Sequence, residues 1–169
     1  MELEPYSPTP YKRIFNIRFI PEQMDFDVSL IFAILNGKVF AAINKKLQRN
    51  FTRSGLGITP EQWTVLFYLS QQDMVSQRAL CDKVYKDKPS MTRIIDAMER
   101  NKLVERCGNP NDRRSNLIRL TNHGRVTKDR AEKIALITQR ESLRGLGLAD
   151  INIAQDVLRR VFDNTVESQ

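Results

Sequence analysis

Two adjacent arginines, Arg113 and Arg114, stand beside a carboxylate, Asp112, in a stretch rich in turn-forming residues. Short strand-like patterns flank the stretch, one from Leu103 to Gly108 and one ending at Leu120, so we expect the arginines near the tip of a hairpin. A guanidinium group on a projecting hairpin can bind phosphate or enter a narrow, negatively charged groove. We expect Asp112 to hold one arginine in place while the other binds the anion, and the sequence does not decide which.

A second set of polar side chains lies at the start of a helix that we expect from about Lys88 to Asn101, with Asp87 as its cap. Apolar residues at helical spacing would bury the opposite face, namely Met91, Ile94, Ile95 and Met98. The early residues of the helix are Lys88, Pro89, Ser90, Thr92 and Arg93. Hydroxyl groups and an arginine fork can reach base edges and phosphates.

A short helix is expected just upstream, from a cap at Ser76 through Tyr85. Its first residues, Ser76, Gln77 and Arg78, are candidates for phosphate contact, because a helix N-terminus offers free N–H groups and a favourable dipole. Two such helices followed by a hairpin form a winged helix, in which the early residues of the second helix face the major groove of DNA. These side chains therefore indicate double-stranded DNA as the partner.

Further helices must hold this lobe. Thr59, Pro60 and Gln62 form a capping-box start for a helix to about Gln71. Its expected buried residues are Trp63, Leu66, Phe67 and Leu69. An apolar pattern on two faces predicts a long helix from about Asp25 to Arg53, and such a helix needs cover on both faces. A second subunit is a source of that cover.

Two helices are expected after the hairpin. Thr121 can cap one that runs to roughly Arg144, and Gly145 and Gly147 then interrupt the chain. A last helix, from about Asp150 to Val166, is expected to bury Ala154, Val157, Leu158, Val161 and Phe162. The predicted fold class is mostly α with a small β-wing.

The predicted organisation is a winged-helix DNA-binding lobe at residues 59–121, flanked by helical dimerisation regions at 26–58 and 122–169. Residues 1–25 contain four prolines and are expected to form an extended N-terminal arm. The net charge of +7 favours an anionic partner. Residues 76–114 carry ten basic and six acidic side chains, which is more than half of the excess.

Enzyme and membrane classes fit the sequence poorly. It lacks a Ser-His-Asp or Cys-His arrangement and a glycine-rich phosphate loop, and one histidine, His123, leaves little for acid–base work, so no catalysis is expected.

With Cys81 and Cys107 as the two cysteines, neither a metal site nor another cofactor is expected. Both thiols are interpreted as small apolar residues, and Cys107 beside Arg106 is the better candidate for reactivity. The longest apolar stretch, Val28 to Ile43, is interrupted, so we expect a cytoplasmic protein without a membrane partner.

The run DKPSMTRIIDAMERNKLVER, followed by NDRRSNLIRLTNHG, resembles the MarR family of bacterial transcriptional regulators. The matching positions are Thr92 and Arg93, Leu103 to Arg106, Asp112 to Arg114, and Leu120 and Thr121 with Gly124. The resemblance covers about residues 28–166 and implies a homodimer with intertwined terminal helices on a pseudo-palindromic operator. Half-sites read by paired recognition helices lie roughly 34–36 Å apart.

The resemblance further implies that a ligand or an oxidant changes the spacing of the two lobes, as in a repressor released by an effector. One peroxide-sensing branch uses a cysteine in the first long helix, and this chain has none before Cys81. The implied pocket would contain Asn36, Phe40, Trp63 and Phe67 and accept a small aromatic or lipophilic effector, although core packing also explains these aromatic residues. The alternative function is a winged-helix module that binds a protein or RNA partner without an effector.

Overall fold

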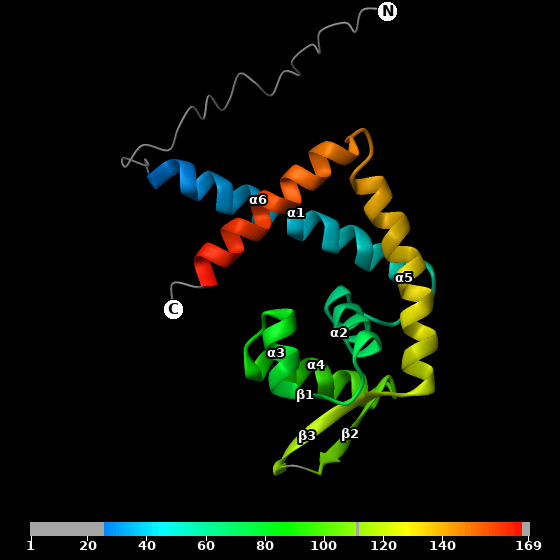
Figure 1. The fold of residues 1–169 in the computed structure, drawn as a ribbon. Helices are drawn as coiled ribbons and strands as arrows, with labels where there is room; N and C mark the ends of the chain where they lie inside the picture. The colour runs from blue at the N-terminus through cyan, green and yellow to red at the C-terminus, as the bar shows by residue number, and fades with distance from the viewer. Residues whose placement is uncertain (1–25, 111, 167–169) are drawn as a thin grey trace, which may run out of the picture. The chain divides into compact units, whose positions relative to one another are not determined.

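The computed structural model describes residues 26–110 and 112–166 (Figure 1). Its elements are α1 (Phe26–Arg53), α2 (Pro60–Gln71), β1 (Val75–Ser76), α3 (Gln77–Val84), α4 (Lys88–Arg100), β2 (Val104–Asn109), β3 (Asp112–Leu120), α5 (Asn122–Ser142) and α6 (Leu148–Val166). The predicted fold class, mostly α with a small β-wing, is confirmed. The predicted arm at residues 1–25 lies outside the described residues.

Four side-chain caps begin the helices as the sequence predicted. Thr59, Ser76, Asp87 and Thr121 each accept a hydrogen bond from the backbone N–H three residues later. At Thr59 the reciprocal bond is also present, because the Gln62 side chain accepts from the Thr59 N–H at 3.0 Å. Each cap satisfies a donor that the helix cannot pair internally, which is worth about 1 kcal/mol. The caps fix where the helices of the lobe begin.

The small antiparallel sheet has the strand order β1-β3-β2. Strand β3 pairs with β2 along the hairpin, with Glu105 opposite Arg119 and Arg106 opposite Ile118, and the register shifts at Gly108 and Asn109. Strand β1 was not predicted. It has two residues, and Val75 pairs with Ile118, so the hairpin is joined to the start of α3.

The core of the lobe is formed by one face of each helix and of the sheet. Fully or nearly fully buried side chains include Phe51, Leu66, Leu69, Leu80, Met91, Ile95, Met98 and Ile118. Burying each of these side chains stabilises the fold by roughly 1.5–3 kcal/mol. The predicted apolar stripe of α4 is confirmed, with Ile94 partly buried. Trp63 and Phe67 were expected in the core but are only partly buried. Between them, Leu66 is buried as predicted, and Val65, which was not predicted, is also fully buried.

The chain divides into two units, residues 1–40 and 41–169, and the division falls within α1. In the second unit, the last part of α1 is tied to α5. The Asn50 amide donates to the buried Thr138 hydroxyl at 2.8 Å, and Lys46 pairs with Glu141 at 2.9 Å. Hydrogen bonds and an ion pair with Lys46 lower the pKa of the Glu141 carboxyl.

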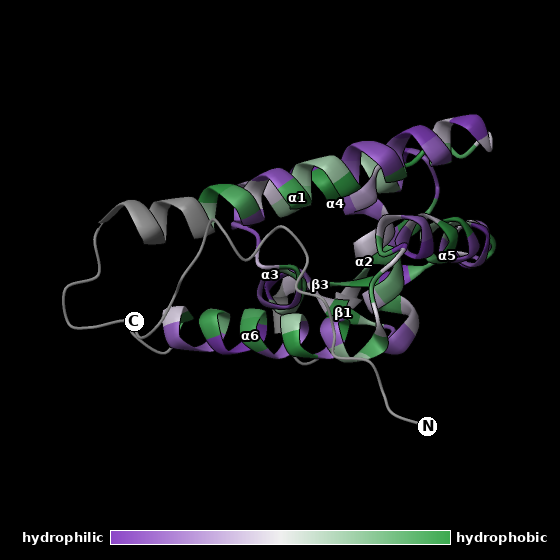
Figure 2. Ribbon diagram, turned by 90° about the horizontal axis from the view of Figure 1, so that it is seen from above, coloured by the Kyte–Doolittle hydropathy of each residue, from purple (hydrophilic) through white to green (hydrophobic). Residues whose placement is uncertain are grey.

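The single chain does not bury the apolar face that was predicted for α6. The helix begins at Leu148 rather than Asp150, and none of its described residues is buried. Val161 is 40% exposed, and Phe162, whose ring meets that of Tyr85 edge-on, is 49% exposed. Figure 2 shows hydrophobic positions recurring along α6, and they lack full cover because the described residues of this chain pack little against them.

Among the described residues, no helix combines the length and apolarity that crossing a membrane requires.

Candidate nucleic-acid interface

The first turns of α4 present polar side chains on the face opposite the buried stripe. Lys88, Pro89 and Arg93 are exposed, and Ser90 and Thr92 are half-buried. Asp87 holds the start of the helix: its carboxylate accepts from the Ser90 N–H at 2.7 Å and from the Ser90 hydroxyl at 2.9 Å. These two bonds lower the pKa of the Asp87 carboxyl. The Ser90 hydroxyl proton is therefore used within the cap.

The start of α3 lies against α4 through one side-chain contact. The Gln77 amide donates from Nε2 to the Thr92 hydroxyl oxygen at 2.6 Å, and that hydroxyl donates to the Lys88 carbonyl at 2.9 Å. The Ser76 hydroxyl accepts from the Ala79 N–H, and Arg78 beside it is exposed. The structure therefore brings the two predicted groups, one from each helix, to the same side of the lobe.

The basic side chains of the lobe fall into two classes. Lys86 pairs with Glu61 at 2.6 Å, and Arg106 pairs with Asp96 at 2.5 Å and with Glu99. By contrast, Arg78, Lys88 and Arg93 form no ion pair with any residue that the structure describes. Each of these three lies in the first turns of α3 or α4. Lys83, Arg100 and Lys102 also form no ion pair with the described residues, so half of the six unpaired cations described in the lobe lie where a helix-turn-helix meets an anion.

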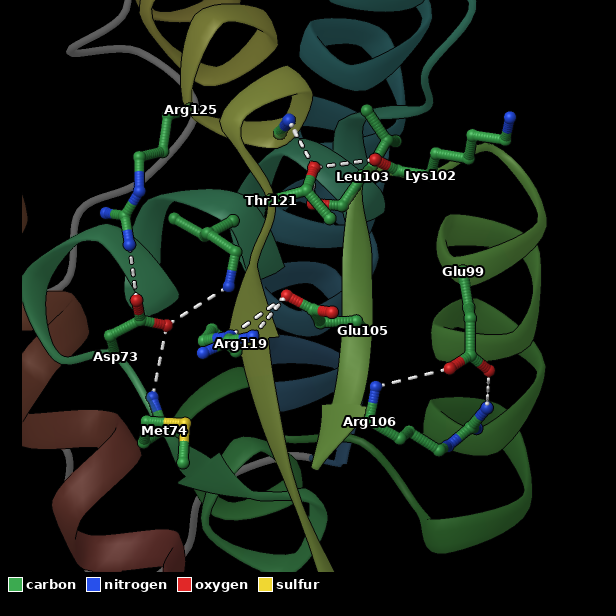
Figure 3. A network of polar contacts seen from close by, with 12 residues as sticks. Asp73, Met74, Glu99, Lys102, Leu103, Glu105, Arg106, Arg119, Thr121 and Arg125 are labelled. Carbon is green, nitrogen blue, oxygen red and sulfur yellow. Dashed lines mark hydrogen bonds and ion pairs between the residues drawn. The ribbon is translucent and has the colours of Figure 1, made fainter. Parts of the chain in front are cut away.

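Arg106 links the wing to α4, a contact that was not predicted from the sequence. Its guanidinium bonds Glu99 on α4, and its backbone N–H donates to Glu99 at 3.2 Å (Figure 3). The same guanidinium also bonds Asp96, one turn earlier on α4. Burial alone would lower the pKa of Arg106, but these carboxylates outweigh burial and raise it. The spacing of Asp96 and Glu99 on one helical face was the available signal for this contact.

A second polar network holds the base of the wing. The Asp73 carboxylate accepts from the Met74 N–H and the Leu120 N–H, each at 3.1 Å, and pairs with Arg125 at 2.5 Å (Figure 3). Met74 has a left-handed backbone, with φ of 58°. Asp73 thus joins the turn after α2 to the end of β3 and the start of α5. Sequence reasoning did not single out Asp73, and its turn-forming type was the only local signal.

The wing tip is described by its backbone only from Asp112 to Arg114. These residues begin β3, with Asp112 opposite Asn109. The side chains of Asp112, Arg113 and Arg114 lie outside the described residues, so the proposed division of work between the two arginines stays a prediction. One described contact crosses the hairpin near the tip: the Asn109 amide donates to the Ser115 hydroxyl at 2.9 Å.

Two of the four predicted pocket residues are in contact. Trp63 and Phe67 lie one turn apart on α2, with ring centroids separated by 6.0 Å. The indole N–H of Trp63 is buried and has no hydrogen-bond partner among the described residues. Asn36, half-buried, and Phe40, 67% exposed, belong to the unit at residues 1–40. The pocket as a set of four residues therefore stays a prediction.

The two cysteines are free thiols and partly buried. Burial, followed by the nearby carboxylates of Asp82 and Asp87, raises the pKa of the Cys81 thiol, which makes its thiolate form scarcer. His123 is exposed in the first turn of α5. Within the described ranges, no group of three histidine, cysteine or acidic residues is placed to hold a metal ion.

The helices and the wing of the lobe are similar to those of known transcriptional regulators. Residues 56–115 match the family model described as the MarR family. YdgJ of Bacillus subtilis (strain 168), an uncharacterized HTH-type transcriptional regulator, is 31% identical over 108 residues. These residues are 64% of this chain and 66% of YdgJ.

Solved structures share the fold over most of the chain. The crystal structure of the transcriptional regulator PA3341 is 29% identical and covers 82% of this chain and 99% of that one, with a TM-score of 0.69. A cysteine mutant of MarR from E. coli, complexed with operator DNA, is 23% identical and covers 82% and 98%, with a TM-score of 0.74. The family match lies on α2, α3, α4 and the wing, and the likeness of fold extends over the flanking helices, so the chain resembles the MarR family in its lobe and shares the fold of MarR-family structures over most of its length.

Proposed function

We propose that this chain is a homodimeric, sequence-specific regulator of transcription that binds double-stranded DNA. It would act as a repressor on a pseudo-palindromic operator, and a small-molecule effector would release it from that operator. The observation that carries the proposal is the location of Arg78, Lys88 and Arg93. They are exposed, lack an ion-pair partner among the described residues and lie in the first two turns of α3 and α4.

In this mechanism α4 enters the major groove, and its buried stripe keeps it fixed on the lobe. Lys88 and Arg93 would contact phosphates or the acceptor edge of guanine. A bidentate arginine contact favours guanine over other bases by roughly 1–3 kcal/mol. Arg78 and the free N–H groups of α3 would bind a phosphate that flanks the groove. Arg113 or Arg114 at the wing tip would enter the adjacent minor groove, whose negative potential is strongest where it is narrow.

The exposed apolar face of α6 supports the homodimer. Val157, Leu158, Val161 and Phe162 are all at least 40% exposed in a single chain. Exposed apolar positions also recur along α1, at Ile34, Leu35, Val39 and Phe40. Contiguous apolar surface of this kind is a sign of an interface, and a second copy offers the same surface in return. A two-fold dimer presents two recognition helices, which matches a palindromic operator.

The indole N–H of Trp63 supports the effector, because it is buried and has no hydrogen-bond partner among the described residues. A buried donor without an acceptor is unfavourable by about 1–3 kcal/mol, and a ligand that supplies an acceptor would remove that penalty. A small aromatic or lipophilic compound with a phenolic or carbonyl oxygen has the required chemistry. Such a compound should raise the melting temperature of the wild type and not that of Trp63→Phe, which keeps an aromatic ring but lacks the donor. Equal shifts for both proteins would contradict this placement.

The DNA-binding proposal is tested by selecting duplexes from a random-sequence library and measuring affinity for the selected site over a range of salt concentrations. Arg93→Ala should weaken binding, and each lost phosphate contact should reduce the salt slope by about 1. The matched control is Arg140→Ala, which removes the same charge from the last turn of α5. Arg113→Ala or Arg114→Ala should weaken binding while the protein remains a folded dimer.

Three outcomes would overturn the proposal. The wild type could fail to enrich any duplex sequence, it could prefer an RNA or protein partner over duplex DNA, or Arg93→Ala could bind the selected site like Arg140→Ala. The second outcome is the alternative in which the winged helix serves as a protein- or RNA-binding module.

A further inference from the structure

The contact between Gln77 and Thr92 fixes which hydrogen-bonding groups α3 and α4 can offer to DNA. Thr92 has one hydroxyl proton, and that proton is donated to the Lys88 carbonyl at 2.9 Å. The Thr92 oxygen must therefore act as an acceptor toward Gln77, whose Nε2 lies 2.6 Å away. Because a hydroxyl without a free proton cannot bond the amide oxygen, the amide of Gln77 has a single favourable orientation.

The consequence for Thr92 is that it has no donor left for a base. Its hydroxyl retains one lone pair and its side chain a methyl group. Gln77 is in the opposite situation. One of its two amide protons is used by Thr92, while the second proton and the oxygen Oε1 have no partner among the described residues. Both side chains are half-buried rather than enclosed, so the remaining groups of Gln77 can reach a ligand.

A donor and an acceptor at the two ends of one amide match a particular base. In the major groove, adenine presents the N7 acceptor beside the N6 amino donor, whereas guanine presents two acceptors. We propose that Gln77, oriented by Thr92, is a specificity-determining residue that reads an adenine in each half-site, and that Thr92 acts as its positioning residue. The inference rests on the proposed binding of double-stranded DNA and changes the role of Gln77 from phosphate contact to base contact.

The test uses the full-length protein and the duplex that the wild type selects from a random library. Each adenine of a half-site is replaced in turn by 7-deaza-adenine, which lacks the N7 acceptor but keeps the Watson–Crick pair. At one position the wild type should lose at least about fivefold in affinity, the lower end of the discrimination expected for a bidentate contact. Gln77→Met, which keeps the side-chain length without an amide, should bind both duplexes equally.

Two variants of Thr92 separate positioning from simple structural support. Thr92→Ser retains the hydroxyl that accepts from Gln77, so it should keep the sensitivity to 7-deaza-adenine. Thr92→Val retains the volume and the branching but removes the acceptor, so it should lose that sensitivity. All variants should keep the salt slope of the wild type, because no phosphate contact is removed.

The inference and the proposed function fail in different ways. If the wild type selects no duplex sequence, the proposed function is wrong. If it selects a site but no adenine substitution distinguishes the wild type from Gln77→Met, Gln77 does not read adenine. A uniform loss of affinity of Gln77→Met for all duplexes, with a shallower salt slope, would show a phosphate contact instead. Equal behaviour of Thr92→Ser and Thr92→Val would rule out positioning by the Thr92 hydroxyl.

Discussion

At the scale of single residues, the motif Leu-Thr-x-x-Gly that begins α5 has a steric explanation. Thr121 caps the helix by accepting from the Gly124 N–H at 2.9 Å, and its hydroxyl donates to the Lys102 carbonyl at 2.6 Å. This brings the first turn of α5 against the backbone that enters β2. A Cβ atom on Gly124 would lie 2.0 Å from the Leu103 carbonyl oxygen. The glycine is therefore required by close backbone approach rather than by an unusual φ.

Gly124→Ala should accordingly destabilise the protein. The clash is with backbone atoms, which cannot move aside like a flexible side chain, so we expect a loss at or above the upper end of about 1–3 kcal/mol. Urea denaturation followed by circular dichroism measures the loss. The matched control is Gly57→Ala, whose added Cβ would meet nothing within 4 Å. Equal denaturation midpoints for the two variants would show that α5 can shift away from Leu103.

At the scale of elements, α4 and the wing are held together by the Arg106 clamp, defined as Arg106 with Asp96 and Glu99. Both carboxylates are partly exposed, so their contribution to overall stability is modest. Their geometric effect is greater, because the fork of one arginine bonds two residues that lie on the same side of α4. The relative placement of α4 and the hairpin therefore depends on a side chain that has no need to touch DNA.

Arg106→Met tests this interpretation. The substitution keeps an unbranched apolar stem but leaves two carboxylates unpaired on α4, so affinity for the selected operator should fall. The salt slope should stay near that of the wild type, because the paired guanidinium is not expected to contact phosphate. Arg93→Met is the comparison, and its slope should fall by about 1. If Arg106→Met lowers the slope as much as Arg93→Met, Arg106 is a phosphate contact rather than a clamp.

The elements differ in how well they could be predicted from the sequence. Caps at Thr59, Ser76, Asp87 and Thr121 join residues three positions apart, so their signals are local and were correctly interpreted. The contact between Asp73 and the Leu120 N–H spans 47 positions, and no local pattern encodes which backbone group meets that carboxylate. Strand β1, with two residues, is too short to show an alternating pattern. The bond from Gln77 to Thr92 likewise depends on how α3 crosses α4.

At the scale of the whole molecule, α6 exposes in the single chain the apolar face that was predicted to be buried. The spacing of its apolar residues indicates that this face of α6 must be covered. It does not indicate whether the covering residues belong to the same chain or to another one. Ala154, Val157, Leu158 and Val161 recur at helical spacing and are all exposed in the single chain. The sequence pattern and the single-chain structure agree if the partner surface belongs to a second copy.

Val161→Glu tests that conclusion, because it places a charge in the middle of the apolar face of α6. Burying an unpaired carboxylate between subunits is strongly unfavourable, so the variant should shift from dimer to monomer in light scattering after size-exclusion chromatography. Asn152→Glu is the matched control: it adds the same charge to α6 at an exposed position away from that face and should remain dimeric. The monomeric variant should also lose affinity for a palindromic duplex far more than for a single half-site, since only the former engages two recognition helices at once. A dimeric Val161→Glu protein with wild-type operator affinity would place the subunit interface elsewhere.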